Sequence, residues 1–230
     1  MIDTIGMTYI GNGRPSNQDA YLLRQKEKNG KLYLLAVVCD GMGGLKKGEI
    51  ASHYIVEVLK QWFDETLFDG LETMGIDMIE QNLIDLIRRI NQNLLLMSRR
   101  MEETKSMGST LTLLFVEEHE FFVLNVGDSR TYWFDRDRKF VTTDHTLAEL
   151  ELRAGHLTKE QAKKDPRRHI LIQCVGVTKD IRIDCYKGRL NPGMEFLLCT
   201  DVFYGLLEKE GDKFPEVCAE IRPFLDSLFL

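Results

Sequence analysis

Three aspartates in this sequence, Asp40, Asp128 and Asp201, each stand within two residues of the end of a short apolar run. The runs are residues 32–39, 121–126 and 196–199. If all three runs are buried strands that end at one place, the carboxylates repel one another and have raised pKa values unless a cation is bound. Mg²⁺ and Mn²⁺ prefer oxygen ligands, so the cluster could hold a divalent metal with the carbonyl oxygen of Gly41. Each aspartate taken alone is more often a turn or cap residue, and it is the triple occurrence that favours a metal site.

Near the N-terminus, Arg14 precedes a further carboxylate, Asp19, in a polar stretch of the chain. A guanidinium group is planar, permanently charged and able to donate two parallel hydrogen bonds, which suits it to binding phosphate. Arg14 is therefore a candidate phosphate ligand, although an arginine in a polar loop can also be simply solvated.

The composition argues against several classes of function. The net charge of −6 argues against nucleic-acid binding, because that affinity comes mainly from Lys and Arg that neutralise phosphates. No apolar run approaches the roughly 20 residues of a membrane helix, and the N-terminus lacks the layout of a signal peptide. The 5 cysteines are scattered without a CxxC spacing, so we expect no zinc site, no disulfide framework and a cytoplasmic protein.

Periodicity predicts the elements that must position the candidate residues. The continuous apolar run at residues 32–39 predicts a buried strand that ends at Asp40. Apolar side chains recur at helical spacing over residues 50–63 and again over residues 79–101, where we expect a helix of about 25 residues. Because such a helix is long, it should cover much of a sheet.

The second half of the chain changes period. Three β-branched or aromatic segments predict an antiparallel meander, since the breaks between them are too short for helical crossovers: residues 110–116, 121–126 and 131–134. A charged helical segment follows at residues 147–164, in which Thr158 and Gln161 are spaced for a capping box. Strands resume at residues 181–186 and 196–199. This order predicts an α+β sandwich rather than a doubly wound fold.

Taken together, six short motifs follow the order of a known family. They are Arg14…Asn17-Gln18-Asp19-Ala20, Val37-Val38-Cys39-Asp40-Gly41-Met42-Gly43-Gly44, Gly108-Ser109-Thr110, Gly127-Asp128-Ser129-Arg130, Thr143-Asp144-His145-Thr146 and Leu198-Cys199-Thr200-Asp201. In this order and spacing they resemble the bacterial type of the type 2C (PPM) family of metal-dependent serine/threonine protein phosphatases. The resemblance implies one domain over residues 1–230, in which two antiparallel β-sheets are flanked by α-helices, with a flap-like insert at about residues 147–169.

The resemblance also implies roles for the candidate residues. Asp40 would bridge two metal ions and Gly41 would supply a carbonyl oxygen. Asp201 would bind the first metal, Asp128 would help Asp201 to hold a third, weaker metal, and Asp19 would hold metal-bound water. Arg14 would bind the substrate phosphate.

The implied reaction is direct hydrolysis of phosphoserine and phosphothreonine in proteins. A metal-bound water would attack phosphorus in line, with two or three Mn²⁺ or Mg²⁺ ions as cofactors. The substrate would be a protein phosphorylated by a serine/threonine kinase, and we expect a monomer that binds neither nucleic acid nor membrane.

The sequence departs from the family in three places. The family's last strand carries an Asp-Asn pair, whereas no such pair follows Asp201 here, so we expect the final C-terminal strand to be missing. Val202 stands where the family has glycine, and a β-branched residue fits poorly if that position needs positive φ. Gln18 and Met42 replace Glu and His of other relatives, as in many bacterial members.

These departures leave two functions to compare. One is an active metal-dependent phosphatase, and the alternative is a catalytically weak PPM-like domain that binds phosphoproteins or regulates a kinase pathway. A plain α+β domain without chemistry is a third interpretation. Hydrolysis of a phosphothreonine peptide with and without divalent metal separates them.

Overall fold

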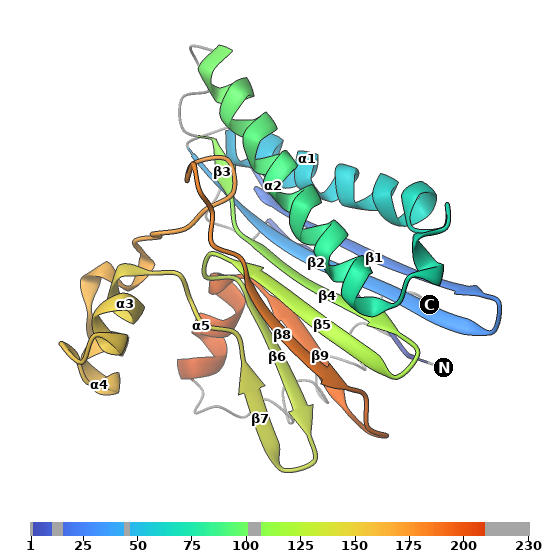
Figure 1. Ribbon diagram of the computed structural model, residues 1–230. Helices are drawn as coiled ribbons and strands as arrows, with labels where there is room; N and C mark the ends of the chain where they lie inside the picture. The colour runs from blue at the N-terminus through green and yellow to red at the C-terminus, as the bar shows by residue number, and fades with distance from the viewer. Residues whose placement is uncertain (1, 11–15, 44–46, 101–106, 210–230) are drawn as a thin grey trace.

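Two antiparallel sheets pack face to face between helices in the computed structural model, which describes residues 2–10, 16–43, 47–100 and 107–209 (Figure 1). The larger sheet has the order β1-β2-β4-β5-β8, with β3 paired to β2, and the smaller sheet has the order β7-β6-β9. The strands of the larger sheet are β1 (Asp19–Lys28), β2 (Lys31–Met42), β3 (Gly108–Ser109), β4 (Leu111–Glu117), β5 (Glu120–Val126) and β8 (Asp184–Arg189). Those of the smaller sheet are β6 (Arg130–Asp135), β7 (Arg138–Val141) and β9 (Glu195–Cys199). The predicted α+β sandwich is confirmed.

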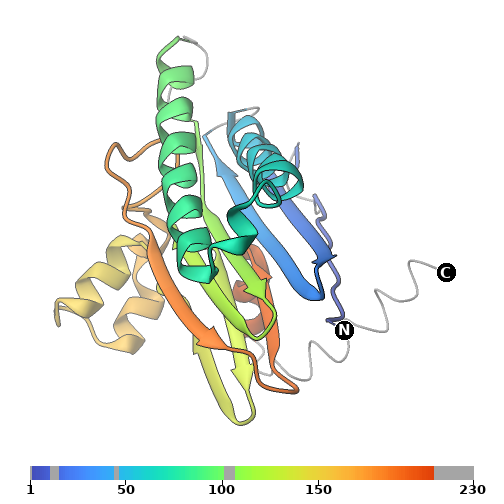
Figure 2. The same cartoon turned by 45° about the vertical axis from the view of Figure 1, so that its right-hand side comes forward.

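Two long helices cover the outer face of the larger sheet (Figure 2). They are α1 (Lys47–Gln61), which continues into a π-helical turn, η1 (Trp62–Thr66), and α2 (Ile76–Arg100), which follows a short 3₁₀ turn, η2 (Leu71–Thr73). The apolar stripe of α2 includes Ile79, Leu83, Ile87, Ile90 and Leu94, all of which are buried. This spacing of three and four residues places every member of the stripe on one side of the helix. Both predicted helices are therefore confirmed.

Apolar side chains fill the space between the two sheets and the space behind the smaller sheet. Leu34, Leu114 and Val123 of the larger sheet share one cluster with Trp133 of the smaller sheet. On the opposite face of the smaller sheet, Tyr132 packs with Tyr204 of the last described helix, α5 (Asp201–Lys209). The layers are thus two helices, the larger sheet, the smaller sheet and α5.

The predicted meander is correct for β4 and β5 and wrong for β6. Strands β4 and β5 pair with each other, but β5 then pairs with β8, whereas β6 pairs with β7 and β9. Gly127, at φ 101°, precedes Asp128 where the chain passes from one sheet to the other. A short break does not distinguish a hairpin from a crossing between packed sheets, because both need only a few residues.

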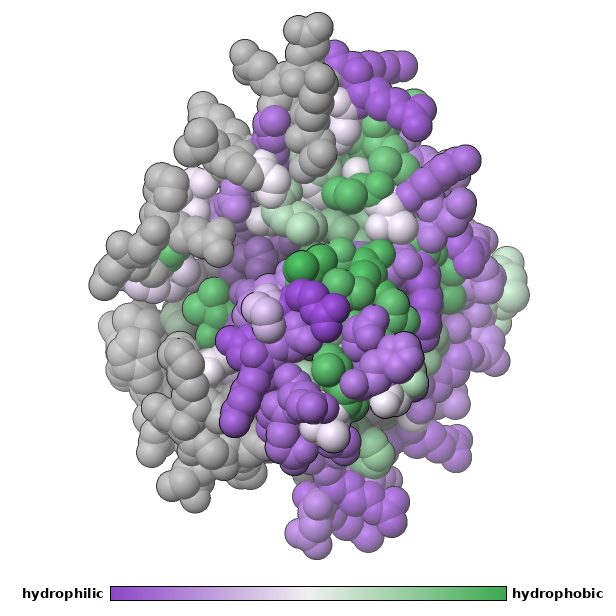
Figure 3. Space-filling model, turned by 90° about the vertical axis from the view of Figure 1, so that its left-hand side faces the viewer, coloured by the Kyte–Doolittle hydropathy of each residue, from purple (hydrophilic) through white to green (hydrophobic). Residues whose placement is uncertain are grey.

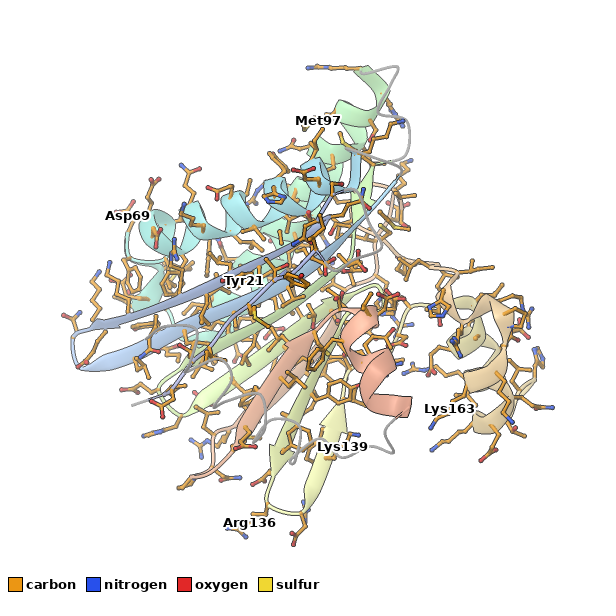
Figure 4. All side chains as sticks on the ribbon, turned by 180° about the vertical axis from the view of Figure 1, so that it is seen from behind. Tyr21, Asp69, Met97, Arg136, Lys139 and Lys163 are labelled. Atoms are coloured by element: carbon orange, nitrogen blue, oxygen red, sulfur yellow. The ribbon has the colours of Figure 1, made fainter. Side chains whose placement is uncertain are left out.

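A small helical segment projects beside the sandwich, as Figure 4 shows around the labelled Lys163. It contains α3 (Leu147–Arg153), α4 (Lys159–Lys164) and the 3₁₀ turn η4 (Pro166–His169), and we call residues 147–169 the flap segment. Thr158 Oγ1 accepts from the amide of Gln161, whose side chain accepts from the amide of Thr158, so the predicted capping box is confirmed. The helical pattern forms two helices rather than one, because Gly155 interrupts it at φ 76°.

Three strands of the structure differ from the prediction, and one prediction lies outside the described residues. Strands β1 and β7 were not predicted, since charged side chains fill the exposed half of β1 and begin β7, and β8 begins at Asp184 rather than at residue 181. The missing final strand concerns residues 210–230, which the structure does not describe. Among the described helices, none has the length and apolar character needed to span a membrane.

Candidate metal centre

Asp19 and Asp40 lie side by side at one end of the larger sheet. They are partners in the register of β1 and β2, and Asp19 is also the acceptor for Thr200 Oγ1, 3.1 Å from Asp19 Oδ2. Asp40 is fixed through its backbone: its amide donates to Thr110 Oγ1 over 2.8 Å, and its carbonyl accepts from Ser109 Oγ over 3.0 Å. Neighbouring strands therefore present two carboxylates at one position, and the Gly108-Ser109-Thr110 motif holds that position in place.

Asp128 and Asp201 come to the same end of the sandwich from the smaller sheet. Asp128 immediately precedes Ser129 and β6, and Ser129 Oγ lies 2.7 Å from Thr110 Oγ1. Asp201 is the first residue of α5 and follows β9. Ligand atoms of Asp128, Asp201 and His169 lie within 4.8 Å of one another. Both sheets thus contribute carboxylates to one centre.

The electrostatics of the centre favour bound cations. Burial, as the largest cause, and the charges of Asp19, Asp201 and Asp128 together raise the pKa of Asp40 to about 8. Burial likewise raises the pKa of Asp128 to about 7, with Asp144 and Asp201 contributing. Carboxylates that raise one another's pKa in this way become fully ionised when divalent cations neutralise their charge. The donor set, made of oxygen atoms, fits Mg²⁺ or Mn²⁺.

The Asp-Gly-x-Gly-Gly motif has a packing reason that the sequence did not reveal. A Cβ added to Gly41 would lie 2.2 Å from the carbonyl oxygen of Gly48, and a Cβ added to Gly48 would lie 2.5 Å from the carbonyl carbon of Gly41. The first turn of α1 therefore touches the backbone directly after Asp40. Two glycines are needed there because no side chain fits between the helix and the strand.

Arg130 belongs to the Gly-Asp-Ser-Arg motif, but it does not face solvent as a free phosphate ligand. Its guanidinium donates to both carboxylate oxygens of Asp144, over 2.8 and 2.7 Å, and its Cζ lies 3.7 Å from the centre of the Tyr204 ring. The arginine therefore joins β6, the residues before the flap segment and α5. Its role in the described structure is to hold these elements together.

His145 is buried beneath the loop that carries Asp128, and sequence reasoning assigned it no role. The amide of Gly127 donates to His145 Nδ1 over 3.2 Å, and His145 Nε2 lies 3.2 Å from Asp184 Oδ2. Burial alone would raise the pKa of Asp184, but hydrogen bonds from Arg182 and His145 lower it overall. Because Nδ1 is the acceptor, the neutral ring carries its proton on Nε2, the atom that faces Asp184.

The structure bears differently on the individual site predictions. It brings Asp19, Asp40, Asp128 and Asp201 together, while their roles as metal ligands, and that of the Gly41 carbonyl, stay predictions. Arg14 lies outside the described residues. The concern about Val202 is resolved, because Val202 lies in the first turn of α5 and is not among the described residues with positive φ.

Comparisons with known proteins agree with this geometry. A sequence model of the family described as protein phosphatase 2C matches residues 5–227. The serine/threonine phosphatase stp of Listeria innocua is 31% identical over 168 residues, which is 73% of this chain and 65% of that protein. Protein phosphatase PhpP of Streptococcus pneumoniae is 26% identical over 221 residues, which is 96% of this chain and 85% of that protein.

A solved structure shows the same arrangement of elements. The crystal structure of serine/threonine phosphatase Stp1 from Staphylococcus aureus superposes with a TM-score of 0.72 at 32% sequence identity, covering 80% of this chain and 70% of that one. The chain therefore spans somewhat less than two thirds of the length of the Listeria relative and a larger share of the other two.

Proposed function

The chain belongs to the protein phosphatase 2C family, and on that premise we propose that it hydrolyses phosphoserine and phosphothreonine in proteins with the help of divalent cations. The observation that carries the proposal is the convergence of four carboxylates from both sheets, two of them with strongly raised pKa values. A structural ion-pair network would place basic groups among such carboxylates. The causes that raise the pKa of Asp40 are instead burial and three other aspartates.

We assign the metal ligands from this geometry and the family motifs. Asp40, Asp201 and the Gly41 carbonyl would hold the ions beside Asp40. Asp128 and Asp201 would together hold a further ion. Asp19 would orient water at the centre. Bound Mn²⁺ or Mg²⁺, two ions or three, would make coordinated water more acidic and neutralise charge on the phosphoryl oxygens. Arg14 would bind the phosphate group of the substrate.

The residues around the carboxylates prepare the centre for this chemistry. Thr110 accepts from the Asp40 amide and contacts Ser129, so one threonine connects the positions of Asp40 and Asp128. Thr200 donates to Asp19 and therefore limits the directions in which that carboxylate can turn. A pre-organised set of acceptors needs little rearrangement when charge develops on the substrate.

The substrate class follows from the family and from the names of the relatives. The Listeria and Staphylococcus proteins are serine/threonine phosphatases, which supports a phosphorylated protein, made by a serine/threonine kinase, as the substrate of this chain. We further propose a monomer that acts in the cytoplasm.

Hydrolysis assays test the proposal. The full chain is assayed with p-nitrophenyl phosphate and with a phosphothreonine peptide, in Mn²⁺, Mg²⁺ or EDTA, beside Asp40→Asn and the control Asp137→Asn in the exposed β6–β7 turn. We expect turnover with Mn²⁺, none with EDTA, near-complete loss in Asp40→Asn and full activity in the control. Turnover without metal, or an active Asp40→Asn protein, contradicts the proposal.

A second candidate is a domain that binds phosphoproteins without turnover. Phosphopeptide binding with metal but without phosphate release would support this candidate over the enzyme.

A further inference from the structure

One histidine reaches the metal centre from the flap segment. His169 is the last residue of η4, and its Nδ1 lies 3.9 Å from Asp201 Oδ2. Its ring also belongs to the group, with Asp128 and Asp201, whose ligand atoms lie within 4.8 Å of one another. The three residues come from η4, from the crossing between the sheets and from the start of α5, so the fold rather than local sequence brings them together.

The distances in this group suit a shared cation. Nitrogen and carboxylate ligands lie about 2.0–2.2 Å from a transition-metal ion, so two ligands of one ion are separated by about 3–4.4 Å. The separation of 3.9 Å between His169 and Asp201 lies within that range, and the 4.8 Å limit of the whole group requires only a small movement inward. The side chain of His169 is 55% exposed, which leaves it room for that movement.

The two carboxylates give the position a charge that a cation would balance. Asp128 is almost fully buried, and burial together with the nearby Asp144 and Asp201 opposes its ionisation. A neutral imidazole adds a donor atom without adding negative charge. The group therefore offers two oxygen donors and one nitrogen donor, with solvent access on the side of the exposed histidine.

We propose that His169 is a nitrogen ligand of the cation held by Asp128 and Asp201, an inference that rests on the proposed function of the carboxylate centre. Imidazole suits the later first-row transition metals such as Co²⁺, Ni²⁺ and Zn²⁺, whereas Mg²⁺ prefers oxygen ligands and retains its waters. His169 thus makes this position selective for the later transition metals over Mg²⁺. It also attaches the flap segment to α5 when the cation is bound.

The neighbouring arginine opposes this ligation. Arg168 Nε donates to His169 Nε2 over 2.8 Å, so the neutral ring carries its proton on Nδ1, the atom that faces Asp201. A cation at Nδ1 requires the other tautomer, in which the proton leaves Nδ1 and one is taken up on Nε2. The hydrogen bond from Arg168 must then break. Removal of Arg168 should therefore leave cation binding unchanged or tighten it.

Cobalt binding to the full chain tests the assignment independently of activity. Co²⁺ and Mg²⁺ are titrated calorimetrically, and the visible absorption of Co²⁺ is followed, in the wild type, His169→Asn, Arg168→Ala, Asp128→Asn and the control His156→Asn. His156 lies in the same flap segment, and its Nδ1 is 2.9 Å from a carboxylate oxygen of Glu151. The control therefore removes a histidine–carboxylate contact of the segment away from the centre.

We expect His169→Asn to weaken Co²⁺ binding at one site by roughly tenfold or more and to change its absorption spectrum, as loss of a ligand does. Mg²⁺ binding should change by less than about twofold, because the oxygen ligands that Mg²⁺ prefers remain. Asp128→Asn should weaken both ions, His156→Asn neither, and Arg168→Ala should bind Co²⁺ at least as tightly as the wild type.

Three results would overturn the ligand role. These are equal Co²⁺ affinity and spectrum in the wild type and His169→Asn, equal losses for Co²⁺ and Mg²⁺, or weakened Co²⁺ binding in Arg168→Ala. The last two would mean that His169 acts only by placing the flap segment. If the wild type hydrolyses phosphopeptide with Mn²⁺ but His169→Asn binds Co²⁺ normally, only this inference fails. If His169 binds Co²⁺ but no hydrolysis occurs, only the proposed function fails.

Discussion

Arg130 and Asp144 face each other through two hydrogen bonds, 2.8 Å from Nε to Oδ1 and 2.7 Å from Nη2 to Oδ2. Both side chains are largely buried, at 18% and 14% exposure. The pair joins the strand that follows Asp128 to the residues that precede the flap segment. It therefore fixes the position of the metal centre relative to the flap without contributing a ligand.

Breaking this pair from one side should destabilise the protein strongly. Arg130→Gln or Asp144→Asn alone leaves the other charged group buried without its partner, which typically costs about 3–5 kcal/mol. The double variant should lose less than the sum of the two single variants, as urea unfolding can measure. The same cycle on the exposed pair Arg88–Asp85 should give a coupling below about 1 kcal/mol. Equal coupling in the two cycles would contradict the proposed importance of burial.

Without metal, the stability of the protein should fall as the pH rises. The folded state raises the pKa of Asp40 from 3.8 to about 8, so the folded chain binds more protons than the unfolded chain between these values. Each such group lowers the free energy of unfolding by up to about 1.4 kcal/mol per pH unit. In EDTA between pH 5 and 7, Asp40→Asn should therefore show a shallower decline than the wild type. A wild-type stability that rises across this window more steeply than that of Asp40→Asn would exclude the mutual repulsion.

Bound Mn²⁺ should make the wild type more stable than Asp40→Asn. Cations that bind the folded state but not the unfolded state stabilise the protein by an amount that grows with the logarithm of their concentration. Thermal unfolding at pH 7.5 with excess Mn²⁺ should give a higher midpoint for the wild type than for Asp40→Asn. In EDTA the order should be the opposite, and a common order in both buffers would argue against cation binding at Asp40.

Substitution of Gly48 should disturb the centre through the backbone. In Gly48→Ala the new methyl group would meet the carbonyl carbon of Gly41 at 2.5 Å, so the helix or the strand must move. We expect a loss of about 1–3 kcal/mol from overpacking and weaker Mn²⁺ binding measured by calorimetry. Gly205→Ala is the matched control, because nothing lies within 4 Å of its added Cβ and it lies inside α5. The control should be neutral or stabilising by up to about 1 kcal/mol.

Two substitutions of His145 separate its two contacts. Asn can replace Nδ1 and keep the acceptor for the Gly127 amide, whereas Gln can replace Nε2 and keep a donor for Asp184. If the contact with Gly127 positions Asp128, His145→Asn should retain more Mn²⁺ affinity than His145→Gln at comparable thermal stability. The reverse order would show that Asp184 is the important partner. The exposed His53 of α1 supplies a control substitution that should change neither property.

Much of this fold could be predicted from local pattern. The apolar run before Asp40 and the apolar stripe along α2 reflect the burial of one or both faces of an element. This pattern can be seen from residues that are close together in the sequence. The capping box of Thr158 and Gln161 is equally local. Such features were predicted because three or four residues are sufficient to define them.

The features that were missed depend on residues far apart in the chain. That β6 pairs with β9 rather than β5 is decided by the packing of two sheets, and the spacing of the strands does not reveal it. The need for glycine at position 48 comes from contact with Gly41, and the approach of His169 to Asp201 comes from the path of the flap segment. Motifs predicted the carboxylates of the centre, whereas the residues that surround these carboxylates could be identified only from the three-dimensional structure.

The hydroxyl pairs between the sheets have a mechanical consequence. Thr110 with Ser129 and Thr112 with Thr131 are buried contacts of 2.7 Å, and each links the larger sheet or its edge to the segment that forms β6. Sliding of one sheet over the other by a single residue would break both contacts and carry Asp128 away from Asp40. The interior of the sandwich therefore sets the spacing of the carboxylates, and core substitutions that shift the sheets should change metal preference before they unfold the chain.

Figure 3 looks onto the side from which α3 and α4 project, where hydrophobic surface lies amid hydrophilic side chains. A shift of the sheets would be transmitted to this face as well, because Arg130 and Asp144 tie β6 to the base of the flap segment.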